Sequence, residues 1–435
     1  MKPLPKRNDT ASVVGLGRSG RALVSHLTAK GIRVFAFDDA PRTALGDLPL
    51  WLASLGVPLF TDGEGELRGD FVFRSPSVRP DAPRLCRAAL RGATVWGEAE
   101  YFAALCPSPV YAVTGSDGKT TTATMLAALL SAMGKKVYLG GNIGRSLLPF
   151  LNELTAEDAC VLELSSFQLM DFEGRVHTGV LTNLSPNHLN WHTDFGEYAA
   201  AKRRLALQSG RTVIEKGLFP EVSALRFSLT EEADVWVKDG YLTAFGVPLF
   251  PITEMRLPGD HNVKNLLAAT AALSDTVTPA VLLDFARRFG GVPHRMEWVA
   301  ERRGVDLINS SIDTTPTRTA ATLAVYKKMA GRNLLLLGGR GKNLPLAPLE
   351  NVLSGVAKAY LFGETEEATA AFLAEKGCPY LCCGNMEAAL LAAFAEARAG
   401  DRVLLSPAAT AYDAYLDFEE RGDVFRRLAR ALPQT

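Results

Sequence analysis

The segment 114–122, TGSDGKTTT, carries the residue types that proteins use to bind phosphate groups. It lies between an apolar run and a helical pattern, which predicts a strand, a tight turn and a helix. Glycines in such a turn let backbone N–H groups point at phosphate oxygens, and the helix N-terminus adds a favourable dipole. Lys119 would place a cation near the outer phosphates, and the Thr120 hydroxyl suits Mg²⁺. We predict that the following residues bind ATP: Gly115, Ser116, Asp117, Gly118, Lys119, Thr120 and Thr121.

This loop is shorter than the common nucleotide-binding pattern G-x-x-x-x-G-K-[ST], because Val113 stands where the first glycine would be. The alternative is an ordinary strand-to-helix turn that happens to contain Gly-Lys-Thr. The order of strand, glycines, lysine, hydroxyl and helix favours the phosphate loop.

Two further polar residues, Glu163 and His188, each come at the end of a predicted strand. Ligands of open α/β sheets bind beyond the carboxyl ends of the strands, so both side chains should lie beside the phosphate loop. Phosphoryl transfer needs cations, and a carboxylate and an imidazole can each bind a metal ion. Alone, each residue is more often a solvated strand-end acid or a turn or core histidine. Their joint placement next to a phosphate loop favours a functional role.

A second glycine motif, GLGRSG at 15–20, follows an apolar strand pattern and opens a helix. Asp38 and Asp39 come about 20 residues later, close to the spacing of the dinucleotide-binding fingerprint. That spacing suits any ligand with a diphosphate and a ribose. An NAD-dependent dehydrogenase is therefore one interpretation, and a sugar-nucleotide site is another.

Three blocks of alternating strand and helix patterns must position these motifs. We predict an α/β fold with three domains, each a mostly parallel sheet flanked by helices. The N-terminal and C-terminal domains should be Rossmann-like, and the central domain should carry the phosphate loop. The expected domains are residues 1–97, 98–298 and 299–435.

The composition is that of an ordinary globular protein and disfavours several classes. Lys and Arg together number 47, as do Asp and Glu, so the zero formal net charge argues against broad binding to nucleic acid or anionic membranes. There is no apolar signal region and no run of about 18 apolar residues. Six cysteines without a CxxC pair favour reduced thiols. We expect a cytoplasmic protein without membrane insertion.

Motifs spread along the chain resemble those of the Mur ligases, ATP-dependent enzymes that activate a carboxylate as an acyl phosphate and couple it to an amino acid. The resemblance covers essentially the whole length. The motifs that carry it are TGSDGKTTT at 114–122, GGNIG at 140–144, ELSSFQL at 163–169, NLSPNH at 183–188, HNVKN at 261–265 and PHRME at 293–297. Together, ELSSFQL and GLGRSG are most similar to the members that add D-glutamate to UDP-N-acetylmuramoyl-L-alanine.

The resemblance implies that the N-terminal domain holds the UDP end of a sugar nucleotide, with an acidic residue near the uracil. This interpretation and the phosphate loop disfavour the dehydrogenase. The implied contacts to the UDP substrate are Gly17, Arg18, Ser19, Asp38, Asp39, Asn142, Ser165, Gln168 and His188.

The resemblance also implies two Mg²⁺ sites. Thr120 and Glu163 would hold the first ion, and His188 would hold the second beside the substrate carboxylate. Lys202 matches a family lysine that is carbamylated and helps to hold the second ion, although a lysine at this place in a helix is normally an exposed, solubilising charge. Lys119, His188 and Lys202 are the expected catalytic residues.

Further residues are implied for the nucleotide and the amino acid. Asn262 and Asn265, which are spaced to share a helical face, and Arg295 would bind ATP, although an HNxxN run is also typical of helix capping. The residues implied for D-glutamate are Thr314, Lys342 and Phe418.

Two segments depart from the family pattern. Residues 309–312 read NSSI where Asn-Asp-Ser-Lys is usual, and Ala411 stands at a usual serine. Asp313 and Thr410 are candidate substitutes for the missing acidic and hydroxyl contacts.

The expected reaction, a step of peptidoglycan precursor synthesis, joins UDP-N-acetylmuramoyl-L-alanine and D-glutamate with ATP hydrolysis, and the enzyme is expected to be a monomer. One alternative is a sibling Mur ligase or a folylpolyglutamate-synthase-like ligase that adds another amino acid. A nucleotide-binding regulator without catalysis is the other, and Ser310, Ile312 and Ala411 suggest it.

Overall fold

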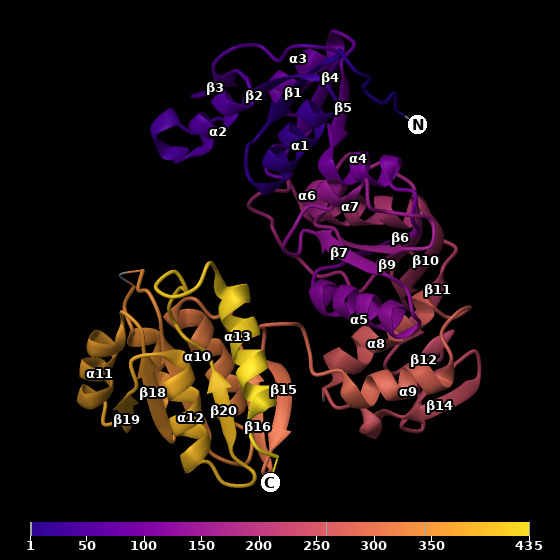
Figure 1. Ribbon diagram of the computed structural model, residues 1–435. Helices are drawn as coiled ribbons and strands as arrows, with labels where there is room; N and C mark the ends of the chain where they lie inside the picture. Colours follow the sequence, from indigo (N-terminus) through magenta and orange to yellow (C-terminus); the bar gives the residue numbers. More distant parts are fainter. Residues whose placement is uncertain (1, 258, 343, 435) are drawn as a thin grey trace. The chain divides into compact units, whose positions relative to one another are not determined.

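The computed structural model describes residues 2–257, 259–342 and 344–434. The chain divides into two compact units, residues 1–289 and 290–435. The first unit contains two β-sheets and the second contains one (Figure 1). All three sheets are mostly parallel and carry helices, which confirms the predicted α/β class. The domain limits at residues 97 and 298 stay predictions.

The first sheet is wholly parallel, and its five strands have the order β3-β2-β1-β4-β5. The central strand β1 is buried along most of its length because helices cover the sheet, and this fits its apolar residues Ala11, Val13 and Val14. The chain leaves β1 for β2 on one side and returns to β4 on the other, so the segment after β1 lies at a switch point where ligands bind. The elements are β1 Thr10–Val14, α1 Arg18–Ala29, β2 Arg33–Phe37, η1 Arg42–Ala44, α2 Leu48–Ser54, β3 Leu59–Phe60, β4 Phe71–Arg74, α3 Pro83–Leu90 and β5 Thr94–Gly97.

The second sheet has nine strands in the order β14-β13-β12-β11-β10-β9-β6-β8-β7. Strands β6 to β12 run parallel, and β13 and β14 extend the sheet as antiparallel strands. Because β6 lies between β8 and β9, the segments that follow these three strands meet at one sheet edge. The strands are β6 Val110–Thr114, β7 Val137–Gly141, β8 Ala159–Glu163, β9 Val176–Leu181, β10 Ser209–Glu215, β11 Leu225–Ser228, β12 Val235–Lys238, β13 Tyr241–Ala244 and β14 Val247–Pro251.

Helices on this sheet place the residues of interest. Helix α5 begins directly after the predicted phosphate loop and packs on α8, and both helices are almost wholly buried along the faces that meet. The helices are α4 Glu98–Leu105, α5 Lys119–Ala132, η2 Leu148–Phe150, α6 Ser166–Leu169, α7 Phe195–Leu207, η3 Ile252–Glu254, α8 Asp260–Ala272 and α9 Pro279–Arg288.

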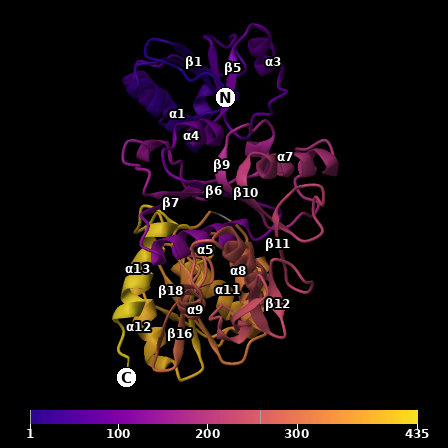
Figure 2. The same cartoon turned by 90° about the vertical axis from the view of Figure 1, so that its right-hand side faces the viewer.

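Helix α4 joins the two sheets of the first unit. Figures 1 and 2 show it between the strands of the first sheet and those of the second. The Tyr101 ring lies edge-on to Phe73 and Trp96, with centroids 4.9 and 5.6 Å apart. Phe102 belongs to the same buried cluster, which continues into Val110 of the second sheet. One apolar core therefore runs through both sheets, and burial of this aromatic surface favours a fixed arrangement.

The sheet of the second unit has six strands in the order β15-β16-β20-β17-β18-β19. Only β15 is antiparallel to its neighbour, and separate apolar clusters cover the two faces of the sheet. The elements are β15 Glu297–Arg302, β16 Val305–Asn309, α10 Pro316–Tyr326, β17 Asn333–Gly338, η4 Ala347–Gly355, β18 Lys358–Phe362, α11 Glu366–Glu375, β19 Tyr380–Cys382, α12 Met386–Glu396, β20 Arg402–Leu405 and α13 Phe418–Ala431.

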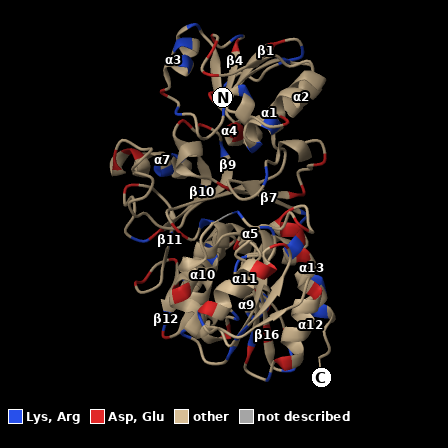
Figure 3. Cartoon of the chain, turned by 90° about the vertical axis from the view of Figure 1, so that its left-hand side faces the viewer, with Lys and Arg blue, Asp and Glu red and all other residues tan. Residues whose placement is uncertain are grey.

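The surface includes an edge strand with two prolines and helices that carry charges of both signs. Strand β14 is the outermost strand of the nine-stranded sheet on one side, and it contains Pro248 and Pro251. Basic and acidic side chains are interspersed along the helices, as α13 illustrates in Figure 3. Among the described residues, no helix combines the length and the apolar character that a membrane crossing requires.

Two glycines of the 15–20 motif differ sharply in the space around them, which gives a test of the fold. A Cβ on Gly20 would lie 2.0 Å from the backbone oxygen of Gly15, whereas a Cβ on Gly17 would meet nothing within 4 Å. We expect Gly20→Ala to lower the free energy of unfolding by about 3 kcal/mol, at the upper end of overpacking effects. The matched Gly17→Ala should change it by less than about 0.5 kcal/mol. Urea unfolding followed by circular dichroism measures both, and equal stabilities would contradict this packing.

Candidate active site

The predicted phosphate loop is a tight turn that only glycine permits at two positions. Gly115 has φ +151°, and a Cβ there would lie 1.9 Å from Thr182 Oγ1. Gly118 has φ +77° and caps the N-terminus of α5, and a Cβ there would lie 2.3 Å from Asn265 Oδ1. The loop therefore needs both glycines for its backbone angles and for close packing.

The segment after β9 holds this loop from one side. Thr182 Oγ1 donates to the Asp117 carbonyl at 2.6 Å, and Asn183 Oδ1 accepts from the Asp117 N–H at 2.8 Å. The Ser116 hydroxyl lies 2.8 Å from both Tyr198 Oη and the Ser185 carbonyl. The Ser116 hydroxyl and the Asp117 backbone thus shape the loop, while the Asp117 side chain is exposed.

Lys119, the first residue of α5, folds back over the loop. Its ammonium donates to the Ser116 carbonyl at 2.8 Å. Burial lowers the pKa of Lys119, and the charges of Glu163 and Asp117 partly oppose that shift. The ammonium therefore lies against the backbone of the loop, and its contact with an outer phosphate stays a prediction.

Thr120 and Glu163, predicted as ligands of the first Mg²⁺, lie in contact. Thr120 Oγ1 donates to one Glu163 carboxylate oxygen at 2.7 Å, and Asn142 Nδ2 donates to the other at 2.7 Å. The Glu163 side chain is buried at the end of β8, beside Val113 of β6. A hydroxyl and a carboxylate are the oxygen ligands that Mg²⁺ prefers. No group of three His, Cys, Asp or Glu residues able to hold a metal occurs in the described ranges, so other oxygen donors would have to complete this site.

Lys202 lies beneath the phosphate loop, on helix α7. It is only 2% exposed, so the alternative of a solvated surface lysine is wrong. Its ammonium donates to the Gly115 carbonyl at 2.7 Å and to Thr114 Oγ1 at 3.2 Å. Burial, reinforced by the charge of Lys119, lowers the pKa of Lys202 to about 7. Much of this amine is therefore uncharged at neutral pH, the form that reacts with electrophiles.

His188 stands on the exposed side of the same region with an unusual backbone. Its φ is +54°, a left-handed conformation that is uncommon for residues other than glycine and often marks functional positions. The imidazole centroid lies 4.9 Å from that of Phe167. Burial, followed by the charges of Lys119 and Lys202, lowers the pKa of His188. The neutral imidazole that results is the form able to bind a metal ion.

The two asparagines of the HNxxN run lie in α8, behind the loop. Both are buried. Asn265 Oδ1 accepts from Thr122 Oγ1 at 3.3 Å and touches Gly118, so this amide fixes the start of α5. The Asn262 N–H donates to the Gly259 carbonyl at 2.9 Å in the first turn of α8.

A cleft of about 390 Å³ opens between the two sheets of the first unit. It brings together five of the predicted contacts to the UDP substrate, Gly17, Arg18, Ser19, Asn142 and Gln168. The first three form the turn into α1, where N–H groups and the helix dipole favour a diphosphate. The remaining lining residues are Ser75, Pro76, Ser77, Gly141, Gly144, Arg145, Ser146, Phe167 and Trp191.

Three other predicted contacts have their side chains engaged elsewhere. Ser165 caps α6 through a reciprocal pair of hydrogen bonds with Gln168. The Asp38 carboxylate accepts from the N–H groups of Leu16 and Ala40 at 2.8 and 3.0 Å, and so it fixes the turn after β1. Asp39 pairs with Arg84 at the surface. None of the three lines the cleft.

The residues predicted for D-glutamate, together with Arg295, belong to the second unit. Lys342 Nζ lies 3.5 Å from Thr314 Oγ1, and Lys342 borders a hollow of about 160 Å³ beside Pro407. Phe418 opens α13, and its carbonyl accepts from Ser311 Oγ at 2.8 Å. This unit therefore brings Thr314 and Lys342 together, as predicted.

The candidate substitutes for the missing family side chains are both occupied within the unit. The Asp313 carboxylate is buried and accepts from the hydroxyls of Thr322 and Ser406 at 2.8 and 2.7 Å. Thr410 Oγ1 donates to the Arg340 carbonyl at 2.8 Å. Both side chains contribute to the internal structure of the unit in this arrangement.

Residues 113–273 match the Mur ligase middle domain, and residues 294–409 match the glutamate ligase domain of the Mur ligases. The UDP-N-acetylmuramoylalanine–D-glutamate ligase of Ruminiclostridium cellulolyticum is 36% identical, over 98% of this chain and 97% of that one. The enzyme of the same name from Clostridium perfringens is 39% identical, over 97% and 96%. The chain belongs to the Mur ligase family.

Solved structures of Mur ligases agree in fold. The UDP-N-acetylmuramate–alanine ligase of Thermotoga maritima gives a TM-score of 0.52 at 18% identity, over 98% of this chain and 100% of that one. The UDP-N-acetylmuramoyl-L-alanyl-D-glutamate–2,6-diaminopimelate ligase gives 0.54 at 20% identity, over 91% of each chain. The resemblance inferred from the motifs is confirmed.

Two arginines of this Mur ligase were missed by the sequence analysis. Arg74 ends β4 and is buried, and it donates to the Phe167 carbonyl and pairs with Asp171. Arg79, five residues later, pairs with Glu197 of α7. Both reach from the first sheet to the second. The available signal was the placement of Arg74 at the carboxyl end of a strand, next to the 75–77 turn.

The burial of Lys202 predicts that this lysine lowers the stability of the folded protein. We expect Lys202→Met to raise the free energy of unfolding at pH 7 by about 1–2 kcal/mol, because replacing a buried ion by an apolar side chain is often stabilising. The pKa of Lys202 is about 7 when folded and 10.5 ordinarily, so the unfolded chain binds more protons between these values. Stability of the parent should therefore rise with pH across this window relative to the variant, by at most about 1.4 kcal/mol per pH unit.

The measurement is urea unfolding of both proteins at pH 7, 8 and 9 in CO₂-free buffer without Mg²⁺. Lys238→Met removes an exposed lysine and should leave the stability within about 0.5 kcal/mol at each pH. A Lys202→Met protein that is less stable than the parent at pH 7 would refute the expectation.

Proposed function

We propose that this chain joins D-glutamate to UDP-N-acetylmuramoyl-L-alanine, with ATP converted to ADP and phosphate. The observation that carries the proposal is the contact of Thr120 and Glu163 beside the phosphate loop. Asn142, which donates to Glu163, also lines the cleft that includes the N-terminus of α1. The cleft suits a diphosphate at the N-terminus of α1, and the phosphate loop next to Glu163 suits phosphoryl transfer. The D-glutamate specificity is taken from relatives of that name at 36–39% identity over nearly the full chain.

Phosphoryl transfer would take place over the phosphate loop. The loop N–H groups, the N-terminus of α5 and the Lys119 ammonium would stabilise the charge on the transferring group. Mg²⁺, when bound by Thr120 and Glu163, would offset the remaining negative charge of the phosphates. Asn142 holds the second carboxylate oxygen of Glu163 and so fixes the direction of the first.

The bond-forming steps follow from the substrate chemistry. A carboxylate oxygen of the alanyl group attacks the γ-phosphorus, and ADP leaves. The amine of D-glutamate then attacks the carbonyl carbon of the acyl phosphate, and inorganic phosphate leaves as the amide forms. Exclusion of water from the cleft would protect the acyl phosphate from hydrolysis.

A second Mg²⁺ site would involve His188 and a carbamylated Lys202. CO₂ adds to an uncharged amine, which loses a proton as the carbamate forms, and the lowered pKa of Lys202 supplies that uncharged form. The carbamate would replace a cation by an anion beneath the loop. His188, kept neutral by its own lowered pKa, is suited to bind the same ion.

The second unit would bind the amino acid. Lys342 can pair with a carboxylate of D-glutamate while Thr314 supplies a hydroxyl, and Phe418 would line the same site. Arg295, with Asn262 and Asn265 of the first unit, would contribute to ATP binding. A monomeric state and a cytoplasmic location stay predictions.

The direct test is phosphate release by the purified protein with ATP, Mg²⁺ and UDP-N-acetylmuramoyl-L-alanine. Supplied with a panel of amino acids, the enzyme should turn over with D-glutamate at least about 100-fold faster than with L-glutamate, L-alanine, glycine or diaminopimelate. Faster turnover with another amino acid would identify a sibling ligase. ATP binding without turnover on any of them would support a regulator.

Removing the charge of Glu163 should abolish most of the activity without unfolding the protein. We expect Glu163→Gln to lower kcat by about 10²–10³-fold, the cost of removing one group that stabilises transition-state charge. Glu157→Gln removes an exposed acid near the end of the preceding loop and should leave kcat unchanged. Steady-state phosphate release measures both, and a Glu163→Gln enzyme with more than a tenth of the parent kcat would exclude this role.

A further inference from the structure

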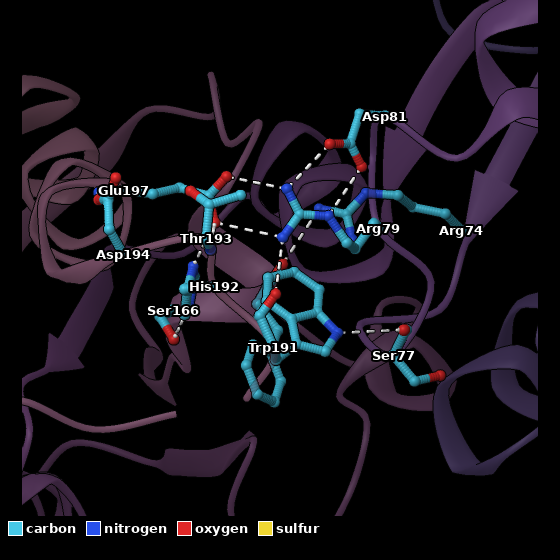
Figure 4. Close-up of polar contacts among 11 residues, drawn as sticks. Arg74, Ser77, Arg79, Asp81, Ser166, Trp191, His192, Thr193, Asp194 and Glu197 are labelled. Atoms are coloured by element: carbon cyan, nitrogen blue, oxygen red, sulfur yellow. Dashed lines mark hydrogen bonds and ion pairs between the residues drawn. The ribbon is translucent and has the colours of Figure 1, made fainter. Parts of the chain in front are cut away.

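Arg79 connects the first sheet to the second with all of its N–H groups. It donates to both carboxylate oxygens of Asp81 at 2.8 Å, to both of Glu197 at 2.8 and 3.2 Å, and to the Trp191 carbonyl at 2.7 Å. These bonds use the five donors of the guanidinium group. Figure 4 shows Arg79 between Asp81, Glu197 and Trp191. A side chain with every donor occupied is held in one orientation.

Glu197 extends this connection into the second sheet. One of its oxygens accepts from the Thr193 N–H and from His192 Nδ1, each at 3.0 Å, and His192 Nε2 lies 2.8 Å from Ser166 Oγ. A carboxylate can only accept, so Nδ1 carries the proton and Nε2 accepts from the Ser166 hydroxyl. The hydrogen bond from Arg79 lowers the pKa of Glu197 to about 2. The segment from Trp191 to Glu197 is therefore bound to α6 on one side and to Arg79 on the other.

Trp191 is the half-buried end of this network, and it lines the cleft. Its ring lies 5.0 Å from the Arg79 guanidinium and 4.3 Å, centroid to centroid, from the Phe167 ring. Its indole N–H points to the Ser77 carbonyl at 3.5 Å. The carbonyl of Phe167 is held by Arg74 in the same way that Arg79 holds that of Trp191. Two arginines of the first sheet thus fix two aromatic residues of the second, and both rings line the cleft.

The order of groups in the proposed substrate assigns a part of it to these rings. The diphosphate suits the turn at Gly17, and the alanyl carboxylate must reach the phosphate loop near Glu163. In a uridine-diphosphate-hexose-peptide chain, the hexose ring lies between these two groups. Phe167 and Trp191 line the cleft together with Gly17 of the α1 turn and with Asn142, which donates to Glu163. A pyranose presents C–H groups on its faces, and an immobilised aromatic ring offers a matching apolar surface.

We propose that Trp191 is a specificity-determining residue that packs against the hexose ring of the sugar nucleotide, and that Arg79 is the positioning residue that holds its indole. This inference rests on the proposed function, because that function supplies the order of groups in the substrate. Trp191 distinguishes a nucleotide that carries a hexose from the nucleotide alone. Arg79 acts on substrate only through Trp191.

The first experiment measures binding by calorimetry with two probes, UDP and UDP-N-acetylmuramoyl-L-alanine. Trp191→Ala should weaken binding of the hexose-bearing probe about 10-fold, as expected for the loss of one aromatic contact, and leave UDP binding within twofold. Trp191→Phe keeps an aromatic surface, so its affinity for the hexose-bearing probe should fall by less than threefold. Trp236→Ala, which removes a half-buried tryptophan from β12, is the matched control and should bind both probes like the parent. Equal weakening of both probes by Trp191→Ala, or no weakening, would overturn the proposal.

The second experiment tests Arg79 with a double-mutant cycle. Arg79→Ala should raise KM for the sugar nucleotide about fivefold, with kcat and the KM for ATP within twofold of the parent. In the Trp191→Ala background the same substitution should add less than twofold, because its effect passes through the indole. Arg79→Lys keeps the positive charge but lacks the planar array of donors of a guanidinium group, so its KM should lie between those of the parent and Arg79→Ala. If the increases in KM caused by Arg79→Ala and Trp191→Ala multiply in the double variant, the two residues act independently, and the positioning role of Arg79 is wrong.

The two proposals fail in different ways. A parent protein that binds UDP-N-acetylmuramoyl-L-alanine but couples no amino acid contradicts the proposed ligase function, while the ratio of the two probes still tests Trp191. A parent that ligates D-glutamate and whose Trp191→Ala variant keeps full affinity for the hexose-bearing probe contradicts only the inference.

Discussion

The phosphate loop depends on a buried lysine beneath it. Lys202 of α7 donates to the Gly115 carbonyl, and no Cβ fits at Gly115 because it would lie 1.9 Å from Thr182 Oγ1. The loop is therefore held between α7 and the segment after β9. The same helix contacts Ser116 through Tyr198 and the first sheet through Glu197. Helix α7 thereby links the nucleotide site to the sugar-nucleotide cleft. Lys202 and Tyr198 therefore both hold the phosphate loop from this one helix.

Much of this arrangement could be predicted because it follows from strand ends. Glu163 and the phosphate loop end neighbouring parallel strands, so their sequence positions alone bring them to one sheet edge. The GLGRSG turn could be placed for the same reason, since it follows the central strand of its sheet. Glycines at 115 and 118 also carried a clear signal, because positive φ and close packing exclude other residues. Sequence spacing was therefore sufficient to predict positions where the backbone conformation or the end of a strand restricts the residue type.

The contacts between the two sheets of the first unit could not be predicted in this way. Arg79 and Glu197 are 118 residues apart, and nothing in either local pattern points to the other. Asp38 satisfied the fingerprint spacing, yet its carboxylate binds backbone N–H groups of its own domain instead of lining the cleft. Lys202 is a second example. Its place in a helix suggested an exposed side chain, but the lysine is buried. Burial and long-range pairing depend on how whole elements pack, which residue spacing does not encode.

The two prolines of β14 have a consequence for the behaviour of the protein at high concentration. A protein whose formal net charge is zero has little electrostatic repulsion to keep its copies apart. The outermost strand of a nine-stranded sheet would then be a template for intermolecular β-pairing and aggregation. Pro248 and Pro251 lack the N–H groups that such pairing requires. Strand β14 is thus made a poor template for intermolecular pairing by its own prolines, where many proteins rely on overall charge.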